Sequence, residues 1–173
     1  THEFVFRIDN ASYISLDNLD LRGGNGTSLD LSYNNHNWQV TNCNLSLNAA
    51  NGVIIKNSNN LTIDNCIVDS NFRVDMSKIP AGGTGIDNRS CYDGITIRSG
   101  VNGIVVKNNL IKNWGHSGIH SSISSSGSRA TGNKIHNNEI TSPDILYGRG
   151  IDYAGYFEKN EIYNNYIHDV QVR

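Results

Sequence analysis

Six copies of one short pattern are spaced along the chain: an apolar residue, a spacer, an asparagine, two further residues and a second apolar residue. The copies are Leu16–Leu21, Val40–Leu45, Ile63–Val68, Val106–Ile111, Ile135–Ile140 and Ile162–Ile167. Successive copies begin 24, 23, 43, 29 and 27 residues apart, and every copy contains the asparagine. A repeat of roughly 20–30 residues is typical of a solenoid, in which each repeat makes one turn of a coil.

A second short apolar segment precedes most of these copies. These segments are SLDL (28–31), GVII (52–55), GITI (94–97), GIHS (118–121) and GIDY (150–153). Short alternating segments bounded by Gly and Asn are typical of β-strands, and no stretch keeps the 3.6-residue period of a long amphipathic helix. We therefore expect strands that stack in parallel from coil to coil, about 4.8 Å apart. The 43-residue interval holds one coil and an insertion, predicted at residues 71–90.

Asparagine is the unusual residue of this chain, with 26 among 173 residues. Asn tolerates left-handed backbone angles, so we expect the recurrent Asn at one corner of each coil. Its side-chain amide can bond the equivalent Asn above and below, which predicts an Asn ladder along the stack. The next position of the pattern holds Cys43 and Cys66 on adjacent coils. Both a disulfide and a pair of free thiols fit that arrangement.

These repeats resemble the right-handed parallel β-helix superfamily of pectate-lyase-like proteins, and the resemblance covers residues 4–170. It implies an all-β fold, a right-handed parallel β-helix solenoid of about six to seven coils, as a single domain over residues 1–173. Neither end of the sequence shows a helical cap for the open coils. We therefore expect a portion of a larger protein, or an assembly in which another chain or segment completes the β-helix.

The superfamily includes polysaccharide lyases, glycoside hydrolases, uronan epimerases, phage tailspikes and adhesins. The resemblance therefore implies a polysaccharide or oligosaccharide partner and a secreted or cell-surface location, and leaves open whether the protein is an enzyme. Composition excludes other classes of partner. The net charge is −2 with 17% charged residues, so nucleic acid is not expected. No apolar run approaches the roughly 18 residues of a membrane span.

Alternation along the second strands predicts which side chains face outward. If the first apolar residue of each segment is inward, the next row faces out: Asp30, Ile54, Thr96, His120 and Asp152. Two positions further, the outward row is Ser32, Lys56, Arg98, Ser122 and Ala154. The preceding row is Ser28, Gly52, Gly94, Gly118 and Gly150. We expect this row to face outward too, as a flat track without side chains that suits a linear polysaccharide.

His120 and Asp152 are predicted to be neighbours on adjacent coils of this face. A uronan lyase or epimerase removes the proton α to a carboxylate, which needs a base and a cation for the developing charge. The candidate catalytic residues are His120 or His116 as base, Asp152 to orient it, Arg98 or Arg149 for the charge, and Asp93 nearby. The candidate substrate-binding residues are Lys56, Tyr92, Trp114, Tyr153 and Tyr156.

Other readings stay open. A hydrolase needs two carboxylates about 5–10 Å apart, which Asp152 could form with Asp93 or Glu158. A non-catalytic glycan-binding or adhesin/tailspike-type β-helix, or a purely structural array, would use the same fold. No C-x-x-C spacing is present, so no zinc site is expected from the cysteines. No metal or cofactor is predicted, with calcium at Asp93 and Asp152 as the alternative.

Overall fold

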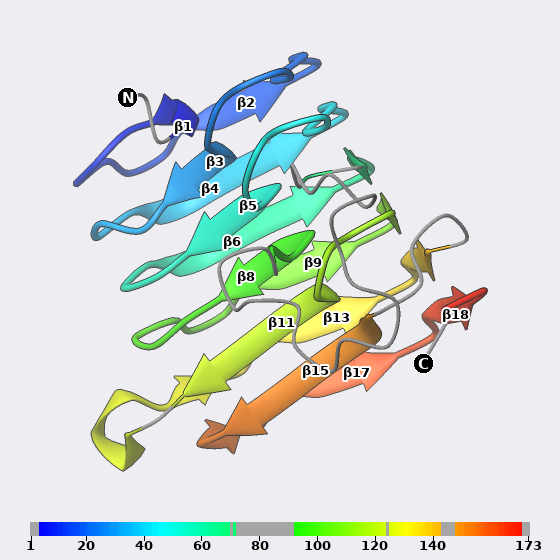
Figure 1. Cartoon of the computed structure of the whole chain (residues 1–173). Helices are drawn as coiled ribbons and strands as arrows, with labels where there is room; N and C mark the ends of the chain where they lie inside the picture. Colours follow the sequence, from blue (N-terminus) through cyan, green and yellow to red (C-terminus); the bar gives the residue numbers. More distant parts are fainter. Residues whose placement is uncertain (1–3, 70, 72–91, 124, 143–147, 171–173) are drawn as a thin grey trace.

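The structure, a computed structural model, describes residues 4–69, 71, 92–123, 125–142 and 148–170. The predicted insertion at 71–90 therefore lies outside the described residues, except for Asn71. The chain winds into coils that stack in sequence order, so that segments about two dozen residues apart lie side by side (Figure 1).

Three parallel sheets form the walls of the coils. The first, here called the histidine sheet, contains β1 (Phe4–Arg7), β3 (Thr27–Leu31), β5 (Val53–Ile55), β8 (Ile95–Ile97), β11 (Ser117–Ile123) and β15 (Arg149–Gly155). The second contains β2 (Ser15–Asp17), β4 (His36–Thr41), β6 (Asn59–Asp64), β9 (Val105–Lys107), β13 (Lys134–His136) and β17 (Glu161–Tyr163). The third contains β7 (Ile67–Asp69), β10 (Leu110–Lys112), β14 (Glu139–Thr141) and β18 (Tyr166–His168).

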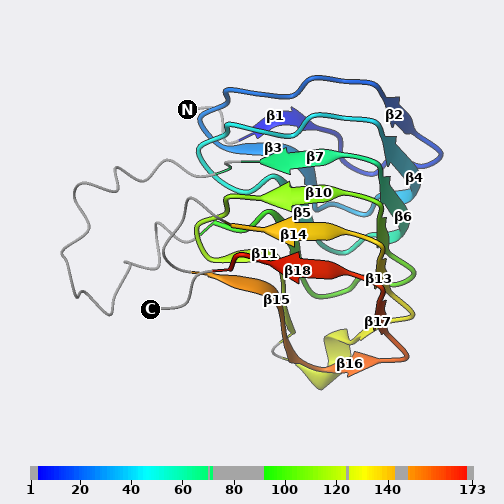
Figure 2. The same ribbon diagram turned by 90° about the vertical axis from the view of Figure 1, so that its right-hand side faces the viewer.

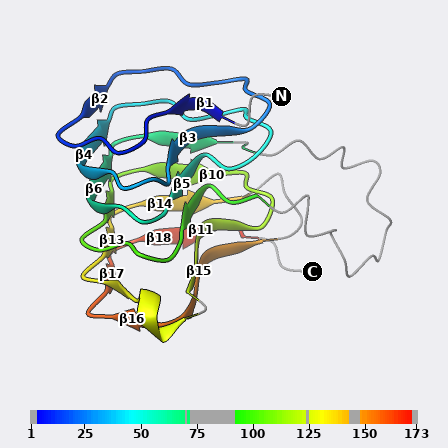
Figure 3. The same cartoon turned by 90° about the vertical axis from the view of Figure 1, so that its left-hand side faces the viewer.

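Two small elements complete the described chain. Strand β12 (Ala130–Thr131) pairs with β16 (Phe157–Glu158), and a 3₁₀ turn, η2, spans Ser126–Ser128. Figure 2 shows the third sheet on one side of the coils, and Figure 3 shows the second sheet stacked along one edge. The predicted all-β parallel β-helix is confirmed. Among the described residues, no helix is long and apolar enough to cross a membrane.

Apolar side chains from all three sheets meet inside the coils. In the histidine sheet, Val53, Ile95 and Ile119 lie in register on successive strands, and none of them is exposed. The second and third sheets add matching rows. These are Val40, Ile63, Val106 and Ile135 in the second sheet and Val68, Ile111 and Ile140 in the third. Because the described strands mostly contribute only one or two buried apolar side chains each, the core is a set of stacked apolar rows.

The recurrent asparagines take the left-handed conformation that the corner requires. The φ angles lie between 52° and 56° at all six positions, Asn18, Asn42, Asn65, Asn108, Asn137 and Asn164. Along this row, the amide of Asn65 donates to Asn42 at 2.7 Å. The amides of Asn42 and Asn108 donate instead to the carboxylates of Asp17 and Asp64. These corner side chains lie at the surface, so the row mixes amide and carboxylate acceptors.

The next position of the repeat forms a buried row of amide contacts. The Asn109 amide donates to Asn138 at 2.9 Å, and Asn138 donates to Asn165 at 2.9 Å. Asn109 and Asn138 also accept from backbone N–H groups of the preceding coil. The continuous run of amide-to-amide bonds is thus one residue later than predicted. A side chain after the left-handed residue points inward, where backbone groups of the corner need partners.

Cys43 and Cys66 occupy the same buried row on the earlier coils. Both are free thiols, so the disulfide alternative is wrong. The backbone N–H of Cys43 donates to the sulfur of Cys66 at 3.4 Å. In the same way, the backbone N–H of Cys66 donates to the side-chain oxygen of Asn109 on the next coil. Burial raises the pKa of the Cys66 thiol to about 12, so it stays protonated at neutral pH.

The glycine row faces the interior, and the predicted outer glycine floor is wrong. A Cβ at Gly94 would lie 2.8 Å from Ile111 Cγ2, and one at Gly118 would lie 2.8 Å from Ile140 Cγ2. Both isoleucines belong to the third sheet. The strand alternation does not extend to this corner, where the histidine sheet and the third sheet converge. Glycine recurs here because no side chain fits between them.

Candidate active site

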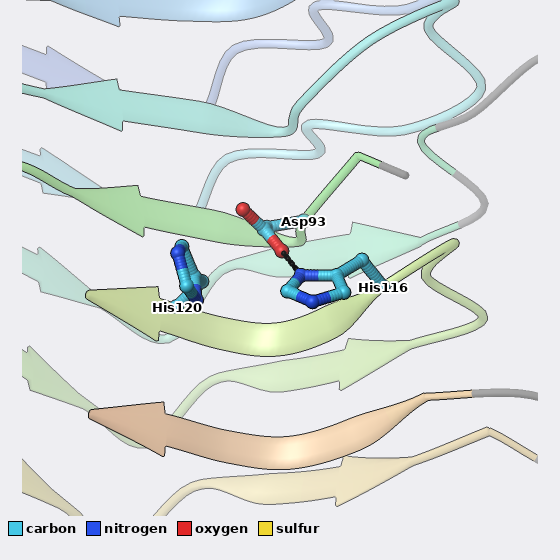
Figure 4. Close-up of side chains that lie close together, drawn as sticks. All are labelled: Asp93, His116 and His120. Carbon is cyan, nitrogen blue, oxygen red and sulfur yellow. Dashed lines mark hydrogen bonds and ion pairs between the residues drawn. The ribbon is translucent and has the colours of Figure 1, made fainter. Parts of the chain in front are cut away.

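Asp93, His116 and His120 converge on the histidine sheet. Strands β8 and β11 pair with Ile95 opposite Ile119, which brings the residues just before the two strands together. His116 directly precedes β11, and His120 lies on the outward side of that strand beside the inward Ile119. Figure 4 shows the three side chains side by side, with the two imidazoles next to each other on the same segment.

A buried carboxylate holds His116. Nδ1 of His116 lies 2.9 Å from Oδ1 of Asp93, and the backbone N–H of Ser117 donates to the same oxygen at 3.1 Å. The Thr96 hydroxyl donates to the other oxygen, Oδ2, at 2.8 Å. Asp93 is only 5% exposed, and these donors satisfy its oxygens. With the proton of His116 on Nδ1, the lone pair is on Nε2.

The second imidazole lies close to the first. The ring centroids of His116 and His120 are 5.1 Å apart, with the planes at 72°. Nδ1 of His120 lies 3.2 Å from Oδ2 of Asp152, which is an ion-pair distance. The angle is not that of a hydrogen bond, and this shielded nitrogen has no hydrogen-bond partner in the described part of the chain. The predicted pairing of His120 with Asp152 across β11 and β15 is confirmed.

Asp152 is bound on its other side by Arg149, whose guanidinium donates to Oδ2. Partial burial acts to raise the pKa of Asp152. The hydrogen bond and charge of Arg149, together with His120, outweigh burial and hold that pKa below its ordinary value. Asp152 is therefore ionised at neutral pH, and Arg149 and Asp152 form one linked group beside the histidines.

Four other candidates lie at or near the surface. Arg98 and Lys56 are exposed and directly follow the inward Ile97 and Ile55. Tyr156 is 46% exposed after β15, and Tyr92 is half-buried beside the residues that lead into β8. The backbone carbonyl of Tyr92 accepts from the N–H groups of Gly115 and His116, which ties this residue to the histidine segment. Their predicted contacts with a substrate stay predictions.

Two aromatic candidates lie on the interior side instead. Trp114 has no exposed surface and belongs to the core. The ring of Tyr153 packs against Phe157 with centroids 4.5 Å apart, and burial raises the pKa of its hydroxyl. Trp114 cannot present a face to a sugar, so its predicted role in stacking on substrate is wrong. The predicted role of Tyr153, which is partly buried, stays a prediction. Tyr153 lies opposite the inward Ser121, which the alternation along β15 already implies.

Glu158, the other carboxylate considered for hydrolysis, lies away from this cluster. It belongs to β16, which pairs with β12, and it forms an ion pair with Arg129 at 3.2 Å. The pairing of Asp93 with His116 was not predicted, although both residues were candidates. The sequence feature that could have predicted this pair is the 24-residue offset between Ile95 and Ile119. The same offset brings residue 93 opposite residue 117, next to His116.

The fold assigns the class of protein. A family model described as "Right handed beta helix region" matches residues 4–167, so the chain belongs to that family. No protein of curated function matches the sequence significantly.

Two solved structures resemble the coils. One is a double mutant of the periplasmic alginate epimerase AlgG, with a TM-score of 0.61 at 12% identity over 91% of this chain. The other is the enzymatically active domain of bacteriophage CBA120 tailspike protein 2, with a TM-score of 0.55 at 14% identity over 96% of this chain. The chain spans 36% of the epimerase chain and 23% of the tailspike chain. At these identities the likeness is one of fold.

Proposed function

We propose that this protein is a carbohydrate-active β-helix enzyme that acts on an extracellular, uronate-containing polysaccharide as a lyase or an epimerase. The observation that favours this function is the Asp93–His116 pair, in which a buried carboxylate holds one imidazole nitrogen at 2.9 Å. A histidine oriented in this way has the form of a general base that works near neutral pH.

In the proposed reaction, Nε2 of His116 takes the proton from the carbon α to the uronate carboxylate. The electron pair of the broken C–H bond moves into the carboxylate as an enediolate. Return of a proton to the opposite face gives the epimer. Alternatively, the enediolate collapses to a C=C bond as the β C–O bond breaks, and the leaving oxygen carries off its bonding electrons and takes a proton from solvent, which cleaves the chain. Both outcomes need cations near the carboxylate, and Arg98, Lys56 and Arg149 are the candidates.

Hydrolysis is less well supported by the carboxylates of this site. A glycosidase needs one carboxyl group that is protonated at working pH. The pKa of Asp152 is held below its ordinary value, chiefly because Arg149 outweighs the effect of burial. Asp93 is buried and occupied by His116, Ser117 and Thr96.

The solved neighbours are compatible with this proposal, since one is named an alginate epimerase and the other a tailspike enzymatic domain. An exported location follows from the proposed polysaccharide substrate. We also propose that the coils are completed by another chain or segment. The last coil leaves Ile162 and Ile167 47% and 46% exposed, which is typical of a surface that a further coil would cover.

A substrate panel tests the reaction directly. The protein is incubated with alginates, pectins, glycosaminoglycans and xylans in the presence of EDTA. Absorbance reports unsaturated uronates, NMR of the polymer reports inverted centres, and a reducing-end assay reports hydrolysis. We expect unsaturated or epimerised product, with a loss of at least about 100-fold in His116→Gln. The matched control His136→Gln, on β13, retains activity. Product unaffected by His116→Gln, or reducing ends without unsaturation, would contradict the proposal.

A non-catalytic glycan-binding protein is the second candidate. The observation that favours it is the exposure of Arg98, Lys56 and Tyr156, which offers cations and a ring without any need for a base. Retention on one glycan of the panel, without turnover and without loss in His116→Gln, would identify this function.

A further inference from the structure

The three side chains at the centre of the histidine sheet also have the composition of a metal site. Asp93, His116 and His120 each offer one donor atom, and these atoms lie within 4.8 Å of one another. We propose that they bind a divalent transition-metal ion of the zinc type. The sequence analysis did not predict this site. It considered zinc only at the cysteines, and cysteine spacing says nothing about a site made of histidines and a carboxylate.

The donor set selects the class of metal. Two imidazoles and one carboxylate suit Zn²⁺ and its transition-metal neighbours, whereas Ca²⁺ and Mg²⁺ take about six or more oxygens. Two donors on a tetrahedral ion at about 2.0–2.1 Å are roughly 3.3 Å apart. The 2.9 Å between Asp93 Oδ1 and His116 Nδ1 is close to this separation. An ion can therefore take the place of this hydrogen bond after the two atoms shift by a few tenths of an ångström, with the imidazole proton moving to Nε2. The His120 donor, which lies within 4.8 Å of both, must move closer to complete the site.

The surroundings of the site support an ion in two further ways. The Thr96 hydroxyl and the Ser117 N–H fix the Asp93 carboxylate, as groups behind a metal ligand commonly do. Nδ1 of His120 is shielded from solvent and has no hydrogen-bond partner among the described residues. Asp152, 3.2 Å from that nitrogen, adds a second negative charge next to the site. One divalent ion at this position would thus lie near two carboxylates and two imidazole rings.

The metal site has a consequence that rests on the proposed function. When the ion is on Nδ1 of His116, the ring proton lies on Nε2, which then has no lone pair to take a proton from substrate. Metal binding and proton abstraction by His116 therefore exclude each other. Zn²⁺ then acts as an inhibitor of the proposed lyase or epimerase, and a chelator restores its activity. The binding itself is independent of the function, because it can be measured without any polysaccharide.

The test is a calorimetric titration of the EDTA-treated and desalted 173-residue chain with ZnCl₂, together with the visible absorption of a Co²⁺ complex. We expect one ion per chain. His120→Gln removes one ligand and weakens binding by more than about tenfold, and Thr96→Val, which loosens Asp93, weakens it by about tenfold or more. The control His136→Gln binds like the wild type. Circular dichroism of each variant verifies that it is folded.

Three results would overturn the site. These are no binding at all, equal affinity in the wild type and His120→Gln, or a Co²⁺ spectrum that Asp93→Asn leaves unchanged. The last two would indicate an ion held elsewhere, for instance near His168. If Zn²⁺ binds as expected but no polysaccharide is turned over in EDTA, the proposed function fails and the metal site stands. If turnover depends on His116 but Zn²⁺ does not bind, the metal site fails and the proposed function stands.

Discussion

Strands β5 and β11 belong to the same sheet and differ most on the outward side. Inward, β5 presents Val53 and Ile55, and β11 presents Ile119 and, at the position of Ile55, the buried Ser121. Outward, β5 presents the half-buried Ile54, whereas β11 presents His120 beside His116. The inward row that contains Val53 and Ile119 stays apolar from coil to coil, whereas the outward row changes in character. The comparison indicates that inward packing determines the coil, and that the candidate catalytic residues lie on the outer side of three coils.

The largest effect should come from filling the inner corner beside β11. A Cβ at Gly118 would lie 2.7 Å from the carbonyl oxygen of Gly150 and 2.8 Å from Ile140. Gly118→Val therefore forces backbone apart, and we expect it to lower the free energy of unfolding by at least about 4 kcal/mol. Urea denaturation followed by circular dichroism measures this.

The matched control for that substitution is Gly127→Ala in η2, where only the Ser125 hydroxyl lies near the added Cβ, at 3.7 Å. We expect a change within about 0.5 kcal/mol. A Gly118→Val protein as stable as the control would mean that the corner has room for side chains, and the glycine row would again be a candidate for the outer face.

A second prediction compares two neighbours of the same residue type on β5. Ile55 is fully buried, so Ile55→Ala should destabilise the protein by about 2–5 kcal/mol. Ile54 points outward, and Ile54→Ala should cost less than about 1 kcal/mol. The two denaturation midpoints, measured under the same conditions, check the difference. Equal losses would show that the outer face of β5 is as much a part of the core as the inner one.

The third prediction separates the two adjacent asparagine rows. The Asn109 side chain bonds the Cys66 N–H, the Ile63 carbonyl and Asn138, so Asn109→Ala leaves buried groups without partners. We expect a loss of about 2–3 kcal/mol. The exposed Asn108 has a φ of 55°, and its side chain donates to the Asp64 carboxylate, so Asn108→Ala should cost about 1 kcal/mol.

Substitution of Asn108 by glycine tests whether the loss of stability in Asn108→Ala comes from the left-handed backbone or from the lost side chain. Asn108→Gly removes the side chain but suits the left-handed backbone, so it should restore most of the stability that Asn108→Ala loses. If Asn108→Ala proves more damaging than Asn109→Ala in thermal melts, the inner row of amides is not what links the coils.

The coil and its register were predictable because they follow from local spacing. The alignment of the repeats, whose copies begin 23 to 43 residues apart, fixes which residues are neighbours. The pairing of His120 with Asp152 followed from that alignment alone. The direction of the glycine row was not predictable in this way. It depends on how closely the third sheet approaches the histidine sheet, and that distance is a property of the packed coil.

The site was predictable as a set of residues and not as an arrangement. His116, His120, Asp93 and Asp152 were all candidates, but the expected partner of the base was Asp152. In the structure Asp93 holds His116, because the residues before β8 and β11 lie at a corner where alternation no longer tells inward from outward. Likewise, three metal donors drawn from two coils leave no short motif in the sequence.

The smallest predicted effect on stability is at His168, on the outer side of the last coil. Its Nδ1 lies 2.8 Å from Oδ2 of Asp169, and its Nε2 lies 3.3 Å from Oε1 of Glu139. The hydrogen bond to Asp169, followed by that to Glu139, raises the pKa of His168 above its ordinary value despite some desolvation. A raised pKa means that the imidazolium stabilises the folded state fully below about pH 6.5, and that this stabilisation disappears as pH rises through the folded pKa. The melting temperature of the wild type should therefore exceed that of His168→Gln slightly at about pH 5 and match it at about pH 9. A difference that grows with pH would show that His168 acts through packing against Tyr166 and not through its charge.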